Sequence, residues 1–353
     1  MMNLNAAIAA VRPLCADSMA GARRRFQNIA IPLGSLGLLE DAILQLAGIQ
    51  RRPGPEIGKR AVAVFCADNG VVAQGVTQCG QDVTAIVTEN LDKAQTSVCR
   101  MALHAGVDVI PIDIGVARDV TGETIRKCKV AYGTQDFTQA PAMTRAQCVQ
   151  AIETGIAVAE RCASDGYQLL CVGEMGIGNT TTTAAVSAVL LGRDPADVTG
   201  RGAGLSSEGL RRKVDAIARG IALHHPDPAD PVDVLAKVGG FDLAGIAGLY
   251  LGAAAHGIPI VADGVITAAA ALCAVRLCPA VRPYILFSHQ SDEPAGRLLL
   301  DAMDARPFIT AGMRLGEGTG AVAAVALLDL ALAVYREMLC FDEASIEAYQ
   351  PLT

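Results

Sequence analysis

One carboxylate in this sequence is surrounded almost entirely by small residues. Glu317 lies in the run LGEGTG (residues 315–320), directly before a long apolar segment. Glycine neighbours leave room for a ligand to lie against the carboxylate, which suits a general base that takes a proton from a substrate. The position also suits a carboxylate that caps the following helix. From these residues alone the two interpretations are even.

A second candidate for a functional site is the glycine-rich stretch that follows the apolar run 169–172. The stretch 173–181 reads GEMGIGNTT and opens a helical segment. Glycines let backbone N–H groups approach an anion, and a helix N-terminus favours a phosphate. The stretch has neither the end of a P-loop nor the spacing of a dinucleotide fingerprint. Because a carboxylate repels phosphate, we expect Glu174 to face sugar hydroxyls; the alternative is an ordinary turn capped by Asn179 or Thr180.

Other charged residues give weaker signals. Lys213 follows the glycine-rich stretch 200–204 and could neutralise a phosphate, although its two neighbouring arginines favour a solvated helix face. Asp242 and Asp263 each stand near glycine, where a carboxylate could bind hydroxyls or cap the next helix. His289 follows an apolar run, and we favour a structural over a catalytic role for it.

The bulk composition excludes several classes of protein. The 353 residues carry a net charge of −7, which argues against a nucleic-acid surface. The 11 cysteines form no Cys-x-x-Cys pair and do not cluster with histidine, so we expect no metal site. Reduced thiols in a large chain favour a cytoplasmic protein.

Two segments bear on targeting and membrane insertion. Residues 1–15 show no basic region followed by an apolar run, so we expect no signal peptide. The segment 243–262 is nearly uncharged and long enough to span a bilayer. Gly257 and Pro259 interrupt it, so we predict a buried helix, a turn and a buried strand, with no membrane span.

The elements that position these residues alternate from residue 60 onward. We predict strands at 61–66, 107–112, 169–172, 258–262 and 284–287. Helices are predicted at 38–49, 83–103, 145–165, 181–191, 206–223, 243 onward, 266–276, 297–303 and 319–338. This alternation indicates parallel βαβ units, whose ligands bind beyond the carboxyl ends of the strands. Polar residues follow several of these strands, and we expect them to meet there.

The two termini read as helical and lie outside the alternation. We therefore predict a small helical domain formed by both ends of the chain. Its parts are the N-terminal segment 1–58 and the C-terminal segment 331–353, and residues 59–330 form the α/β catalytic domain.

Six blocks in chain order together resemble one family, the nicotinate-nucleotide:dimethylbenzimidazole phosphoribosyltransferases of cobamide assembly. The resemblance runs from the block GSLG at 34–37 to the final helix, nearly the whole chain. The blocks are CADNGV at 66–71, GEMGIGNTT at 173–181, GGFDL at 239–243, DG at 263–264, SH at 288–289 and RLGEGTG at 314–320.

The resemblance implies a Rossmann-like parallel sheet with helices on both faces, a small helical domain and a homodimer. It implies that nicotinate mononucleotide and 5,6-dimethylbenzimidazole give α-ribazole 5′-phosphate and nicotinate, without a metal or cofactor. It makes Glu317 the general base. The residues it places around the substrates are Glu174, Met175, Gly176, Asn179, Thr180, Gly202, Lys213, Asp242, Asp263, Ser291, Leu315 and Gly316.

Three departures from the family pattern leave the acceptor base open. Ile31 stands where the family often has a lysine, and Ile86 and Val87 stand where many members place a glutamine that lines the base pocket. The loop 77–80 also differs. The alternatives are a related phosphoribosyltransferase that acts on another base or a phenolic, and a non-catalytic nucleotide-binding homologue.

Overall fold

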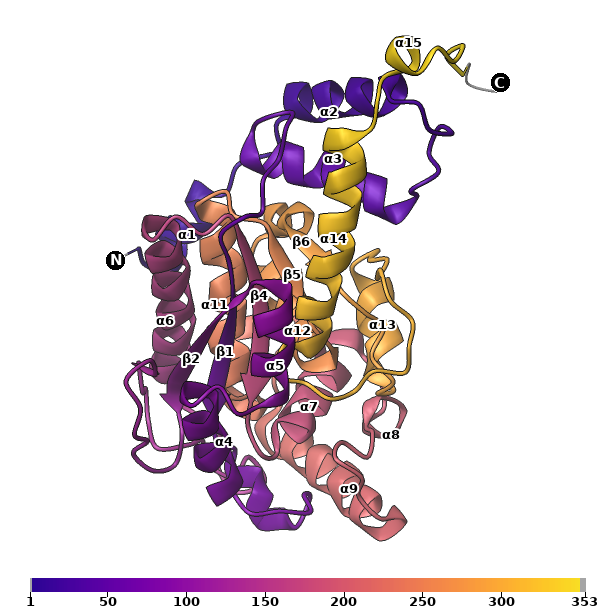
Figure 1. Ribbon diagram of the computed structural model, residues 1–353. Helices are drawn as coiled ribbons and strands as arrows, with labels where there is room; N and C mark the ends of the chain where they lie inside the picture. The colour runs from indigo at the N-terminus through magenta and orange to yellow at the C-terminus, as the bar shows by residue number, and fades with distance from the viewer. Residues whose placement is uncertain (1, 350–353) are drawn as a thin grey trace.

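The computed structural model describes residues 2–349, which contain a six-stranded sheet (Figure 1). Its strand order is β3-β2-β1-β4-β5-β6, and each neighbouring pair is parallel. This is a doubly wound order, in which the direction of winding reverses between β1 and β4. The predicted Rossmann-like α/β fold is confirmed. The strands are β1 (Arg60–Ala67), β2 (Asp108–Gly115), β3 (Arg126–Lys127), β4 (Leu169–Met175), β5 (Ile260–Ala262) and β6 (Ile285–Phe287).

Helices cover both faces of the sheet, which explains why its strands are apolar throughout. Alternate residues of β1 point to opposite faces: Ala63 and Phe65 belong to one buried cluster, Val64 and Cys66 to the other. The first face packs on α6 (Arg145–Ser164), α7 (Asn179–Leu191), α10 (Pro231–Val238), α11 (Phe241–Ala255) and α12 (Val265–Leu277) (Figure 1). The second face packs on α4 (Asp82–Asp92), α5 (Ser97–Ala105) and α14 (Thr319–Glu337).

The helices agree with the predicted segments in most places, with ends that move by a few residues. The other helices include α1 (Leu4–Ala10), α8 (Pro195–Val198), α9 (Ser207–His224), α13 (Ala295–Ala302) and the 3-10 helices η1 (Gly70–Gln74) and η2 (Pro279–Tyr284).

Helices from both ends of the chain gather beyond one end of the sheet. There α2 (Ala16–Asn28) and α3 (Leu38–Gln50) pack against the far half of α14 (Thr319–Glu337), near α15 (Phe341–Ala344) (Figure 1). Phe26 of α2 stacks on Tyr335 of α14 with ring centroids 4.9 Å apart. The core around these helices is continuous with that on the second face of the sheet. The domain bounds 1–58, 59–330 and 331–353 stay a prediction.

The prediction of one helix over 83–103 is wrong. The chain forms α4 (Asp82–Asp92), breaks, and starts again as α5 (Ser97–Ala105). At the break Ala94 adopts the left-handed conformation with φ +54°. The Asp92 carboxylate accepts hydrogen bonds from the backbone N–H and hydroxyl of Thr124, both at 2.7 Å, which ties this end of α4 to a distant loop. The break creates a second helix N-terminus beside the functional site.

The apolar segment 243–262 forms the elements predicted for it. It contains α11 (Phe241–Ala255), a turn at Gly257 with φ +71°, and β5, and its side chains are mostly buried. The helix α14 is long and apolar enough to cross a bilayer, but more than half of it is buried within the fold. Core helices of water-soluble proteins meet the same test, so α14 is explained by its packing on the sheet.

Candidate active site

A cavity of about 200 Å³ lies at the carboxyl ends of β4, β5 and β6. This is the edge at which doubly wound folds bind ligands. Eleven of the thirteen residues proposed from the sequence line it, and the remaining two, Lys213 and Asp242, lie behind its wall. The eleven are Glu174, Met175, Gly176, Asn179, Thr180, Gly202, Asp263, Ser291, Leu315, Gly316 and Glu317.

The loop that carries Glu317 is held directly against the end of β4. A side chain at Gly173 would overlap the Glu317 carbonyl group, so glycine is required for this approach. Glu317 itself has φ +61° between two glycines that also have positive φ. This conformation costs a non-glycine residue roughly 1–2 kcal/mol. Such strain in a cavity wall is typical of a residue retained for function.

The Glu317 carboxylate is fixed from one side only. Its Oε2 accepts a hydrogen bond of 3.0 Å from the backbone N–H of Val98, in the first turn of α5. Within residues 2–349, Oε1 has no hydrogen-bond partner, and the side chain is partly exposed to the cavity. Glu317 therefore caps a helix, as one interpretation of the sequence held, but the helix is α5 and not the following α14. The capping leaves the second oxygen free.

Asp263 caps α14, the helix that follows Glu317. Its carboxylate accepts hydrogen bonds from the backbone N–H groups of Gly318, Gly320 and Ala321 at 3.2, 2.7 and 3.1 Å. The side chain is buried, and burial raises its pKa to about 7 although the backbone donors act in the opposite direction. The alternative that Asp263 caps the next helix, α12, is wrong. Its contacts fix the loop that aims Glu317.

His289 packs beside the Asp263 carboxylate, at the end of β6. Its Nδ1 is 3.0 Å from the Ser288 hydroxyl and 3.8 Å from Asp263 Oδ1. Burial lowers the imidazole pKa, which favours the neutral ring. These contacts agree with the structural role expected for this histidine, although its edge reaches the cavity wall.

Three buried polar side chains meet behind the first turn of α7. The Asn179 side-chain amide donates to the carboxyls of both Glu174 and Asp242, the latter at 3.2 Å. Burial raises the pKa of Glu174 to about 8, helped by the Asp242 charge, and raises that of Asp242 to about 6. A protonated Glu174 can therefore donate a hydrogen bond into the cavity at neutral pH.

Neither residue expected to cap α7 does so. The N-cap is Gly178, with φ +91°, and it makes no side-chain hydrogen bond. Asn179 is instead used by the buried acids, and Thr180 turns toward Lys213. The expected glycine-rich turn is present, but the side chains of Asn179 and Thr180 bind other side chains instead of capping the helix.

Lys213 is fully buried beside the glycine-rich loop 200–204. Its Nζ donates to the Thr180 hydroxyl at 2.8 Å and to the Gly200 carbonyl at 3.1 Å. The interpretation of Lys213 as part of a solvated helix face is wrong, because α9 turns this residue away from its exposed arginine neighbours. Burial lowers its pKa to about 8, so the ammonium is largely charged at pH 7. This region can receive an anion.

Apolar side chains also line the cavity, among them Met175 and Leu315. Met175 ends β4 and is half-buried, whereas Leu315 is 58% exposed at the rim. Gly316 lies so close to Glu174 that a Cβ there would be 2.6 Å from its Oε1. Ser291 is buried, and its hydroxyl accepts a weak hydrogen bond from the Glu293 N–H at 3.4 Å. Met175 and Leu315 thus give an apolar part to the cavity that Glu317 lines.

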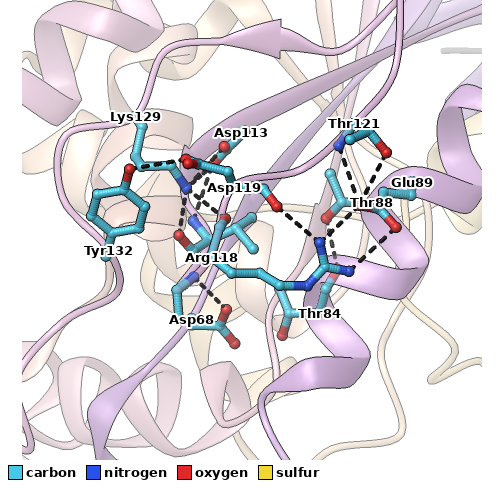
Figure 2. A network of polar contacts seen from close by, with 12 residues as sticks. Asp68, Thr84, Thr88, Glu89, Asp113, Arg118, Asp119, Thr121, Lys129 and Tyr132 are labelled. Carbon is cyan, nitrogen blue, oxygen red and sulfur yellow. Dashed lines mark hydrogen bonds and ion pairs between the residues drawn. The ribbon is translucent and has the colours of Figure 1, made fainter.

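The acidic residues at the carboxyl ends of β1 and β2 hold the fold together and do not line the cavity. Asp68 Oδ2 accepts from the Ala117 N–H at 2.8 Å, and Asp113 pairs with Lys129 at 3.0 Å (Figure 2). Arg118, in the loop after β2, binds Glu89 of α4 at 2.8 Å. This contact lowers the pKa of the Glu89 carboxyl to about 2. Figure 2 shows this network fastening the loop after β2 to α4.

Of the three departures from the family pattern, Ile31 packs against the core on the second face of the sheet and does not line the cavity. Ile86 is 47% exposed on α4, and neither it nor Val87 lines the cavity. The loop 77–80 borders a second small cavity that shares Gly176 and Thr180 with the first. Sequence reasoning missed two contributors, the Val98 N–H and the carboxylate of Glu293. Neither has a local sequence signal, because each depends on contacts between distant segments.

The fold and the cavity define a class of protein. It is a doubly wound α/β protein whose ligand site combines a cationic end, an apolar wall and a partly free carboxylate. A family model described as phosphoribosyltransferase matches residues 11–346.

Named relatives narrow this class. A protein of Acetivibrio thermocellus named nicotinate-nucleotide–dimethylbenzimidazole phosphoribosyltransferase is 49% identical over 329 residues, which are 93% of this chain and 94% of the relative. One of the same name from Ruminiclostridium cellulolyticum is 44% identical over 351 residues, 99% of this chain and 100% of the relative. The crystal structure of CobT from Thermus thermophilus matches with a TM-score of 0.90 at 41% identity, covering 94% of this chain and 100% of its own.

The chain therefore belongs to the nicotinate-nucleotide–dimethylbenzimidazole phosphoribosyltransferase family. The resemblance inferred from six short blocks is confirmed over nearly the full length.

Proposed function

We propose that this protein transfers the phosphoribosyl group of nicotinate mononucleotide to 5,6-dimethylbenzimidazole, giving α-ribazole 5′-phosphate and nicotinate. This reaction belongs to the assembly of the cobalamin lower ligand. The observation that carries the proposal is the Glu317 carboxylate, with one oxygen held by the Val98 N–H and the other free in the cavity. Family membership supports the substrates.

The chemistry needs one base. As the bond from the ribose carbon to the pyridinium nitrogen breaks, that carbon becomes oxocarbenium-like and nicotinate leaves with the bonding electrons. One ring nitrogen of the benzimidazole attacks the carbon. Glu317 Oε1 accepts the proton from the other ring nitrogen, so the product ring is neutral. A general base of this kind contributes roughly 10²–10⁴-fold, and alignment of two substrates contributes up to ~7–11 kcal/mol.

The remaining residues divide by chemistry along the cavity. Lys213, Thr180 and the Gly202 N–H are proposed to hold the phosphate, where Lys213 supplies a positive charge. Glu174 is proposed to donate to a ribose hydroxyl, and Asn179 and Asp242 hold it in place from behind. Met175, Gly176, Leu315 and Gly316 are proposed to enclose the base, and Asp263 and Ser291 to support the loops around it.

A nicotinate-release assay tests the proposal. Purified protein is given nicotinate mononucleotide with 5,6-dimethylbenzimidazole, other benzimidazoles, adenine or p-cresol. The expected result is nicotinate release with equimolar α-ribazole 5′-phosphate. Release only with another acceptor would support the related-transferase alternative. Nicotinate mononucleotide binding without release for any acceptor would support the non-catalytic alternative.

We also propose that the enzyme is a cytoplasmic homodimer. All eleven cysteines are unpaired, which fits a reducing compartment. Leu103 of α5 and Leu330 of α14 are 72% and 65% exposed on two helices that pack together, a surface suited to a second copy. Light scattering of wild-type protein and of the Leu103→Glu variant tests this: a dimer that becomes monomeric is expected, and a monomeric wild type contradicts it.

A further inference from the structure

We propose that the carboxylate of Glu293 occupies the phosphate end of the cavity when the site is empty, and that the phosphate of the incoming mononucleotide displaces it. This inference rests on the proposed function, because it concerns the same site. It makes Glu293 a resident anion that competes with substrate and sets the affinity of the enzyme for the phosphate group.

The position of Glu293 is defined by one backbone donor. Its Oε1 accepts a hydrogen bond of 3.0 Å from the Gly202 N–H. A Cβ built on Gly202 would lie 2.9 Å from the Thr180 hydroxyl oxygen and 3.6 Å from Lys213 Nζ, so the three groups converge. Glu293 therefore uses an N–H that stands beside a hydroxyl and a buried ammonium, a combination that recognises phosphate oxygens.

The negative charge of Glu293 balances the buried positive charge of Lys213. Lys213 is fully buried, and burial lowers its pKa to about 8, whereas the Glu293 charge raises it. A carboxylate nearby thus helps Lys213 to stay protonated while no ligand is bound. A phosphate brings at least the same charge, so it can replace the carboxylate but cannot share the cradle with it.

A neighbouring cavity can receive the displaced Glu293 side chain. Glu293 is only partly buried, and it stands between the main cavity and a neighbouring one, both of which it lines together with Arg314. The neighbouring cavity is bordered by the loop 199–204 and by Asp292, which pairs with Arg314 at 3.0 Å. The displaced carboxylate turns toward Arg314, the cation that lines both cavities with it.

A different role would predict the opposite result. If Glu293 only tethered the Gly202 loop, its removal would loosen the cradle and weaken phosphate binding. If it competes with phosphate, its removal strengthens binding. The two roles therefore differ in the sign of one measurable effect.

The experiment compares Glu293→Gln, which keeps an acceptor for the Gly202 N–H without the charge, with Glu293→Ala, which removes both. Binding of inorganic phosphate at pH 7 is measured by calorimetry, and the KM values for nicotinate mononucleotide and for nicotinate riboside are measured separately. We expect both variants to bind phosphate on the order of tenfold more tightly, as removal of one like charge from a partly screened site allows. The KM for the mononucleotide falls, and that for the riboside, which lacks the phosphate, stays unchanged.

The control is Asp301→Asn, which removes the same charge from an exposed pair with Arg297 on α13 and should leave phosphate binding unchanged. Unchanged or weaker phosphate binding in both Glu293 variants would overturn the proposal. Because phosphate binding needs no turnover, this outcome is distinct from failure of the proposed function, which would appear as a wild-type enzyme that releases no nicotinate.

Discussion

The Glu317 carboxylate and the Val98 backbone N–H lie 219 residues apart in the chain and 3.0 Å apart in the structure. The contact joins the loop before α14 to the first turn of α5, which exists only because the chain breaks after α4. It fixes one carboxylate oxygen and so determines the direction of the other. A proton acceptor held in this way loses little rotational freedom when a base binds.

The left-handed conformation of Glu317 should be measurable as strain. Glu317→Gly and Glu317→Ala both remove the carboxylate, but only glycine adopts φ +61° without penalty. We expect the glycine variant to be more stable than the alanine variant by about 1 kcal/mol in urea denaturation, after the greater flexibility of unfolded glycine is allowed for. In both variants kcat should fall by roughly 10²–10⁴-fold. Equal stability of the two would show that the loop relaxes.

Asp263 should act on turnover through the loop that it caps. Asp263→Asn places an NH₂ group among the backbone donors of Gly318, Gly320 and Ala321, which disturbs the start of α14. We expect kcat to fall by up to roughly 10²-fold through misplacement of Glu317, with little change in the KM for nicotinate mononucleotide. Asp301→Asn, an exposed acid on α13, is the control. A large rise in KM at unchanged kcat would indicate direct substrate binding instead.

Glu174 should make the protein less stable as the pH rises. Its folded pKa of about 8 is well above the ordinary value of 4.5, so the folded state holds a proton that the unfolded state has lost. Stability from this group is complete below about pH 4.5 and is lost as the pH rises toward 8. We expect Tm to fall between pH 5.5 and pH 8, and Glu174→Gln to reduce that fall. An identical pH dependence in the variant would contradict the protonated state.

The fold followed from the sequence because its signals are local. Short apolar runs such as 61–66 and 284–287 are buried on both faces, and polar residues follow them. The break between α4 and α5 could not be predicted, since Ala94 is a good helix former and the tie between Asp92 and Thr124 joins distant segments.

The site was predictable only where its residues have a local sequence signal. Glu317 stood out because its neighbours are glycines, and the structure adds what holds it. Lys213 could not be distinguished from its neighbours by spacing, because one residue along a helix separates an exposed from a buried position. The contact of Glu293 with Gly202 spans 91 residues and has no motif.

The most direct test of the account is the Glu317→Gln variant, assayed with nicotinate mononucleotide and 5,6-dimethylbenzimidazole. The glutamine oxygen can still accept from the Val98 N–H, so the loop should keep its place while the proton acceptor is lost. The account predicts that kcat falls by roughly 10²–10⁴-fold and that nicotinate mononucleotide still binds. Near-normal turnover in this variant would contradict the assignment of Glu317 as the general base.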